Sequence, residues 1–203
     1  MVAIINYGLG NLGSIANMLK VIGEKSVITA EKNEIEAADR IILPGVGAFD
    51  AGMERLAEAG LVDVLREQAL EKKKPILGIC LGMQLLGRKS EEGRLEGLGL
   101  IPFDNIRFRL EESDLKVPHM GWDIVTFQQK NPLLEEIEGT QRYYFVHSYH
   151  ARCDAPENVL MTCDYGYEFA AAVVQDNIYG VQFHPEKSHD FGMALLNNFV
   201  KRC

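Results

Sequence analysis

The sequence predicts an α/β fold: an open, mostly parallel sheet flanked by helices and extended by antiparallel strands in the second half. Short apolar runs alternate with amphipathic helical patterns over roughly the first 87 residues, which indicates a parallel sheet. Strand-like runs then dominate, and a helical pattern returns only near the end. The length of 203 residues suits one domain over residues 1–203, because two domains would be cramped.

The first half supplies the parallel strands and their crossover helices. Its short apolar runs have the length and composition of buried strands. Strands are expected at residues 2–6, 26–30, 40–43 and 76–79. Helices are expected at residues 14–22, 53–70 and 81–87, where apolar residues recur at helical spacing.

The second half supplies the antiparallel extension. Strands are expected at residues 106–110, 117–122, 143–150, 168–175 and 178–183. Asp176-Asn177 between the last two predicts a tight hairpin. Residues 191–200 form a closing helix, and the polar residues 88–96 form an exposed loop.

Composition excludes several classes of protein. The chain is 47% hydrophobic and 25% charged, as soluble globular proteins are. Its net charge of -8 argues against nucleic acid or an anionic membrane as the main partner. No apolar run reaches the ~20 residues that span a bilayer, and the start lacks the features of a signal peptide. We therefore expect a cytoplasmic protein whose four cysteines are reduced thiols.

A cysteine between two glycines marks a candidate nucleophile. Gly78-Ile79-Cys80-Leu81-Gly82 follows a buried strand and opens a helix, which is the thiol form of a nucleophile elbow. The helix N-terminus favours a thiolate, and the N–H of Leu81 is available to an oxyanion. The alternative is that Cys80 is a small buried hydrophobic residue, as many free cysteines are.

A nucleophilic thiol needs a base, and five histidines are candidates. In Gly180-Val181-Gln182-Phe183-His184-Pro185-Glu186 a strand ends at His184, and Glu186 is near enough to orient its imidazole. This predicts a triad of Cys80, His184 and Glu186. His150 is expected at the exposed end of its strand.

Metal binding is an alternative for the same segment. His184, Glu186, His189 and Asp190 carry zinc-type donor atoms, although His189-Asp190 fits the start of the last helix better. The His-x-Glu of zinc deaminases requires a Pro-Cys-x-x-Cys pair, which this chain lacks. No metal is expected.

A glycine-rich loop near the start allows a different function. Residues 8–13 match Gly-x-Gly-x-x-Gly, and Glu31 lies near the end of the next strand, as in NAD-dependent oxidoreductases. Against this, the polar pair Asn6-Tyr7 precedes Gly8, and there is little room for a substrate domain. A non-catalytic interaction module is the third class considered.

Together, the cysteine elbow and His184-Pro185-Glu186 resemble the triad-type (class I) glutamine amidotransferases. The resemblance implies that Cys80 attacks the glutamine side-chain amide, that His184 moves protons and that Glu186 orients it, without a cofactor. Residues 44–49 resemble the family's oxyanion loop, which implies that N–H groups of Leu81, Val46 and Gly47 hold the oxyanion. Glutamine-binding residues implied by the resemblance are Gln84, His147, Ser148 and Tyr149.

Further segments resemble the glutaminase subunits of imidazole glycerol phosphate synthases, notably residues 6–14, 118–122, 144–149 and 184–188. This implies a heterodimer with a (β/α)8-barrel cyclase. The cyclase uses the ammonia to make imidazole glycerol phosphate and an aminoimidazole carboxamide ribotide in histidine biosynthesis. The implied partner-facing residues are Gly10, Asn11, Met120, Trp122 and Lys187. The alternative is a glutaminase subunit of a pyridoxal phosphate, anthranilate or GMP synthase.

Overall fold

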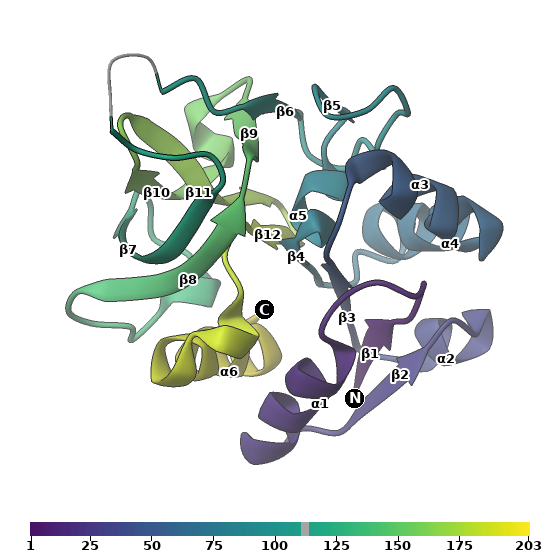
Figure 1. Ribbon diagram of the computed structural model, residues 1–203. Helices are drawn as coiled ribbons and strands as arrows, with labels where there is room; N and C mark the ends of the chain where they lie inside the picture. The colour runs from purple at the N-terminus through teal and green to yellow at the C-terminus, as the bar shows by residue number, and fades with distance from the viewer. Residues whose placement is uncertain (111–113) are drawn as a thin grey trace.

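A mixed sheet forms the centre of the protein. The computed structural model describes residues 1–110 and 114–203, and these ranges contain a sheet of 12 strands with helices on its faces (Figure 1). The main strand order is β2-β1-β3-β4-β12-β11-β10-β7-β8, and β9, β6 and β5 branch from it. The predicted α/β fold class is therefore confirmed.

Parallel pairing covers the first part of the sheet. It includes β1 (Val2–Ile5), β2 (Ser26–Thr29), β3 (Arg40–Gly45), β4 (Ile76–Cys80) and β12 (Ile178–Val181). The strand β4 lies between β3 and β12 and is parallel to both. Because parallel strands end at one edge, the segments that follow β3 and β12 flank the end of β4.

Antiparallel strands extend the sheet on the side away from β2 and occupy the left of Figure 1. They are β6 (Phe103–Arg107), β7 (His119–Phe127), β8 (Gln141–His147), β9 (Tyr149–Cys153), β10 (Val159–Asp164) and β11 (Glu168–Gln175). The short β5 (Lys89–Ser90) pairs in parallel with β6. Asp176 and Asn177 connect β11 to β12, which confirms the predicted hairpin.

Helices bury apolar side chains against the sheet in two clusters. One cluster contains Ile15 and Leu19 of α1 and Leu195 and Phe199 of α6; the other receives side chains of α2 to α5. The helices are α1 (Leu12–Val21), α2 (Lys32–Ala37), α3 (Phe49–Glu58), α4 (Leu61–Arg66), α5 (Leu81–Leu86) and α6 (His189–Arg202). No helix in the described ranges combines the length and apolar content required for a membrane span.

Several predicted boundaries were wrong in the first half. The single helix expected at residues 53–70 is divided: α3 ends before Gly60, whose φ of 69° interrupts the helix, and α4 runs into a π-helical turn at Glu67–Glu71. Helix α2 was not predicted, because its six residues show too few apolar positions for a period. The strand β5 lies in the segment expected to be loop.

The second half also differs in detail. The strand expected at residues 143–150 is two strands that separate at Ser148, since β8 pairs with β7 whereas β9 pairs with β6 and β11. Two strands are displaced from the expected ranges: β6 begins at Phe103, and β7 begins at His119 and continues to Phe127. The strand β10 was missed.

A glycine at the start of α5 permits the closest backbone approach in the core. A Cβ atom on Gly82 would lie directly against the carbonyl oxygen of Leu43 in β3. We expect Gly82→Ala to lower the free energy of unfolding by about 3 kcal/mol or more, because backbone rather than a flexible side chain must move. Gly13→Ala is the control: a Cβ there meets nothing within 4 Å, so alanine should be neutral or stabilising. Urea unfolding measures both, and equal stability of the two variants would contradict this account of the turn.

Candidate active site

Cys80 lies at the sharp turn between β4 and α5. Its backbone has φ 53° and ψ -111°, a conformation that L-residues rarely adopt. The flanking glycines make the turn possible, since a Cβ on Gly78 would lie 2.7 Å from the carbonyl oxygen of Gly82. Strained backbone is a common feature of functional sites. Cys80 is 7% exposed and lines a pocket.

His184 and Glu186 form a buried pair beside Cys80. The Nδ1 of His184 lies 2.8 Å from Oε1 of Glu186, and the side chains are only 1% and 2% exposed. Asn11 donates from Nδ2 to the same carboxylate oxygen at 2.8 Å. This amide, which comes from the glycine-rich loop, fixes the carboxylate that in turn orients the imidazole. The Nε2 of His184 is buried and makes no hydrogen bond of regular geometry to the described residues.

The pair is polarised toward an imidazolium and a carboxylate. Burial opposes charge on His184, but the nearby Cys80 sulfur and the hydrogen bond to Glu186 outweigh burial and raise the pKa of His184 to about 9. Burial likewise favours the neutral form of Glu186, yet hydrogen bonds from His184 and Asn11 leave its pKa lowered. His184 is therefore protonated at neutral pH and can donate a proton to a leaving group next to the sulfur.

A pocket of about 300 Å³ opens at Cys80. The structure brings the predicted nucleophile, oxyanion and glutamine-binding residues together around it. Its lining is Val46, Gly47, Cys80, Leu81, Gln84, Glu92, Pro118, Val146, His147, Ser148, Tyr149 and His184. Glu186 is not among these residues and lies behind His184.

The loop after β3 forms one wall of the pocket. Gly47 has φ 102°, which favours glycine, and Val46 is 37% exposed. The loop is anchored on both sides: the hydroxyl of Tyr7 donates to the carbonyl oxygen of Pro44 at 2.6 Å, and Phe49 N–H donates to Glu92 Oε2 at 2.8 Å. Two N–H groups can thus be presented at the end of β4 by a loop with fixed ends.

Two residues of the site were missed by the sequence analysis. Gln182 lies directly before Phe183-His184; its Nε2 is 3.9 Å from the Cys80 sulfur and its Oε1 accepts from Gln84 Nε2 at 3.2 Å. Glu92 lines the pocket from the segment that was expected to be a plain exposed loop. A polar residue between the apolar strand β12 and Phe183 was a usable signal for Gln182, whereas nothing in the sequence distinguished Glu92 from its acidic neighbours.

The residues predicted to face a partner lie outside the pocket lining. Met120 and Trp122 point outward from β7 and are 60% and 41% exposed, and the ring of Trp122 stacks on His189. Lys187 is exposed, with Nζ 5.6 Å from the ring of Tyr144. Gly10 is half-buried in the same loop as Asn11.

His150 and His119 are buried outside the pocket lining. His150 is buried, 4% exposed, and bonds through Nε2 to Tyr167. The prediction that it lies at the exposed end of its strand was wrong, because its ring packs against Phe108, Tyr167 and Phe169. Within the described ranges, one group gathers three metal-type donor atoms within 4.8 Å: His119, Asp123 and Cys163. Burial raises the pKa of Cys163 to about 12, so it is a protonated thiol, and His119 bonds to Asp123. We interpret this group as hydrogen-bonded side chains.

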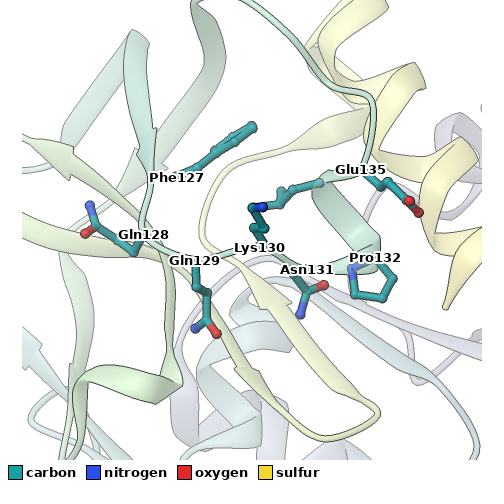
Figure 2. A pocket seen from close by; sticks show the side chains of 8 residues that line it. Phe127, Gln128, Gln129, Lys130, Asn131, Pro132 and Glu135 are labelled. Carbon is teal, nitrogen blue, oxygen red and sulfur yellow. The ribbon is translucent and has the colours of Figure 1, made fainter.

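A larger hollow of about 650 Å³ lies elsewhere, at the end of β7 (Figure 2). Figure 2 shows Lys130, Asn131 and Pro132 close together, with Gln128 farther to the left. The lining of this hollow contains no cysteine or histidine, and its acid, Glu135, bonds to Arg202. The pocket at Cys80 is therefore the candidate active site despite its smaller volume.

Known proteins resemble the chain over its whole length. Residues 3–203 match the family model for glutamine amidotransferase class-I. Imidazole glycerol phosphate synthase subunit HisH 2 of Pseudomonas aeruginosa is 52% identical over 99% of each chain, and that of Methanococcus maripaludis is 53% identical over 100% of each. The structure of PurLQS from Thermotoga maritima matches with a TM-score of 0.73 at 20% identity, over 98% of this chain and 96% of that one.

Proposed function

Because the chain belongs to the class I glutamine amidotransferases, and within them to the HisH subunits of imidazole glycerol phosphate synthase, we propose that it hydrolyses glutamine to glutamate and ammonia through Cys80. The observation that carries the proposal is the buried imidazole of His184 between Cys80 and Glu186. For a chain of this family the oxidoreductase alternative is wrong.

The first half of the reaction forms a thioester. The Cys80 sulfur attacks the side-chain carbonyl carbon of glutamine, and the carbonyl oxygen takes the negative charge. N–H groups of Leu81 and of the Val46–Gly47 loop hold that oxygen; in comparable sites one such donor contributes about 3 kcal/mol. His184 gives its proton to the departing nitrogen as the carbon–nitrogen bond breaks, so ammonia leaves and the glutamyl group stays on sulfur.

The second half releases glutamate. His184, now neutral, takes a proton from water, and the resulting hydroxide attacks the thioester carbon. The carbon–sulfur bond breaks, and the proton on His184 restores the resting imidazolium beside the Cys80 sulfur. Glu186, held by Asn11, stabilises the imidazolium in each half-reaction.

Glutamine carries a carboxylate and an ammonium that the pocket must recognise. Glu92 is the acidic side chain in the pocket lining, so it suits the α-ammonium group. Gln84 and the His147–Tyr149 segment also line the pocket, where Gln84 Nε2 donates to the carbonyl oxygen of Tyr149 at 3.2 Å. We assign to these residues the binding of the substrate.

Removing the charge of Glu92 should weaken glutamine binding. Glu92→Gln keeps an acceptor for the N–H of Phe49, so the loop remains anchored while the charge is lost. We expect KM for glutamine to rise about tenfold with kcat nearly constant, as for the loss of a charged hydrogen bond. Glu96→Gln is the control, because Glu96 lines a different hollow on the surface. An unchanged KM in Glu92→Gln would contradict the assignment; steady-state kinetics on the assembled synthase measures it.

The ammonia acceptor is a (β/α)8-barrel cyclase that forms a cytoplasmic heterodimer with this chain in histidine biosynthesis. The names of the two relatives support this, since each is called a subunit of imidazole glycerol phosphate synthase. Met120 and Trp122 offer exposed apolar surface for the contact, and Gly10, Asn11 and Lys187 complete the proposed interface. One domain over residues 1–203 provides both the pocket and this interface.

Reconstitution tests the proposed function. The chain is mixed with the cyclase, glutamine and the phosphoribulosyl-formimino ribotide, and imidazole glycerol phosphate is measured. Glutamine-dependent formation of this product supports the proposal. Glutamine hydrolysis without transfer to the cyclase would instead assign the chain to another synthase, such as those for pyridoxal phosphate, anthranilate or GMP.

A further inference from the structure

A line of hydrogen bonds connects the pocket wall to the edge of the β7 surface. His147 Nδ1 lies 2.8 Å from the carbonyl oxygen of Tyr149, and His147 Nε2 lies 3.0 Å from Nδ1 of His119. His119 Nε2 lies 3.1 Å from Oδ2 of Asp123, whose side chain is 37% exposed. His119 and His147 are also directly paired residues of β7 and β8.

The line requires one more proton than two neutral imidazoles carry. A carbonyl oxygen only accepts, so His147 Nδ1 must donate to Tyr149. If His147 is neutral, its Nε2 is an acceptor and His119 must donate from Nδ1. His119 Nε2 then faces a carboxylate oxygen, which also only accepts, unless it holds a second proton. The complete line therefore contains one imidazolium balanced by Asp123.

The surroundings assign that charge to His119. His147 is deeply buried, and burial together with the histidines at 119, 150 and 184 lowers its pKa well below the usual value. The ring of His119 instead stacks between Phe145 and Tyr165, at centroid distances of 4.7 and 4.0 Å, where aromatic faces stabilise a cation. It also has the carboxylate of Asp123 as a direct partner.

We propose that His119 and Asp123 are positioning residues for glutamine, which fix the protonation and orientation of His147 and so hold the His147–Tyr149 wall of the pocket. One atom of this wall, the carbonyl oxygen of Tyr149, accepts hydrogen bonds from both His147 and Gln84 and so holds the wall in place. Neither His119 nor Asp123 lines the pocket, so they act through His147. The inference rests on the proposed glutaminase activity and deepens it.

The line makes glutamine binding dependent on pH. Burial lowers the pKa of His119, and the hydrogen bond with Asp123 opposes this only in part. Above that pKa, which lies below the ordinary value of 6.5, the second proton leaves and the line loses one hydrogen bond, so all three hydrogen bonds form only in mildly acidic solution. The titratable groups that face the two rings are Asp123 on β7, Cys163 on β10, Tyr165 after β10, His150 on β9 and His184 after β12. The protonated Cys163 thiol adds no charge over this range.

Asp123→Asn and Asp123→Ala separate this role from general packing. The asparagine amide can donate to Nε2 of neutral His119. All three hydrogen bonds of the line then form with two protons on the imidazoles instead of three. In the assembled synthase, at a pH below the pKa of His119, we expect Asp123→Asn to keep KM for glutamine within about twofold of the parent; Asp123→Asn should also lack the parent's rise of KM with pH. At the same pH, Asp123→Ala cannot bond to His119 and should raise KM about fivefold with kcat little changed. His119→Phe keeps the stacked ring but orphans His147 Nε2 and should raise KM about tenfold.

Nitrogen NMR of the imidazoles tests the line without any turnover. We expect His147 to remain neutral with the proton on Nδ1, and His119 to titrate in the parent but not in Asp123→Asn. The proposal is overturned if KM and its pH dependence are the same in the parent and both Asp123 variants, or if His147 carries its proton on Nε2. A parent that forms no ammonia from glutamine would instead refute the proposed function, and the NMR result would still decide the line.

Discussion

Cys80→Ala and Cys80→Ser should abolish glutamine-dependent synthesis by the assembled enzyme while synthesis from added ammonium salt persists. The sulfur is the atom that bonds to the glutamyl carbon, and neither a methyl group nor an unactivated hydroxyl replaces it. The loss of a nucleophile in a triad typically costs about 10⁴-fold or more in kcat. Ammonia formation and product formation are measured on the same preparation, with glutamine and with ammonium as alternative nitrogen donors.

Cys153→Ser is the matched control for this experiment. Cys153 is a half-buried thiol at the end of β9, outside the pocket, and its pKa is raised by burial to about 12, so it is not nucleophilic. Its replacement should leave glutamine-dependent turnover within about twofold of the parent. Unchanged glutaminase activity in Cys80→Ala would refute the thioester mechanism, and equal losses in both variants would indicate a folding effect.

His184→Asn should reduce kcat by about 10²- to 10⁴-fold, because the imidazole beside the sulfur is the group that protonates the leaving ammonia. Gln182, whose Nε2 lies 3.9 Å from the sulfur, has an amide that does not exchange protons in this way. Glu186→Gln is the graded comparison: the amide oxygen can still accept from Asn11, but the charge that favours imidazolium is lost. Its kcat should fall less than that of His184→Asn. Equal activity of His184→Asn and the parent would contradict the role of His184.

The His184→Asn substitution should also change how the free energy of unfolding depends on pH. Folding raises the pKa of His184 from 6.5 to about 9, so the charged imidazole stabilises the folded state. That contribution is complete below pH 6.5, declines as the pH rises toward 9 and is lost above it. The stability advantage of the parent over His184→Asn, measured by urea unfolding, should decline over that interval. An advantage that grows with pH would contradict the imidazolium.

Local motifs explain why much of the site could be predicted. The turn at Cys80 depends on residues adjacent in sequence: an apolar strand, two glycines and the first residues of a helix. His184 and Glu186 are likewise separated by one proline that fixes their spacing. The parallel pairing of β3, β4 and β12 then joins the two motifs, which is the common arrangement of parallel strand ends.

Features that depend on long-range pairing could not be predicted. The strand β10 is buried on both faces, so its sequence does not alternate, and its pairing with β7 and β11 is not visible locally. The break at Ser148 arises because β8 and β9 join different neighbours. Glu92 reaches the pocket only because its segment folds over the start of α3. For the same reason the line from Asp123 to His147 is visible only in three dimensions.

Labelling with an electrophilic glutamine analogue tests the central claim most directly. The synthase is treated with the reagent, digested, and the modified residue is located by mass spectrometry. The account predicts one adduct on Cys80, prevented by excess glutamine and strongly slowed in His184→Asn, with Cys153, Cys163 and Cys203 unmodified. An adduct on another residue, or labelling of Cys80 that glutamine does not prevent, would contradict the proposed active site.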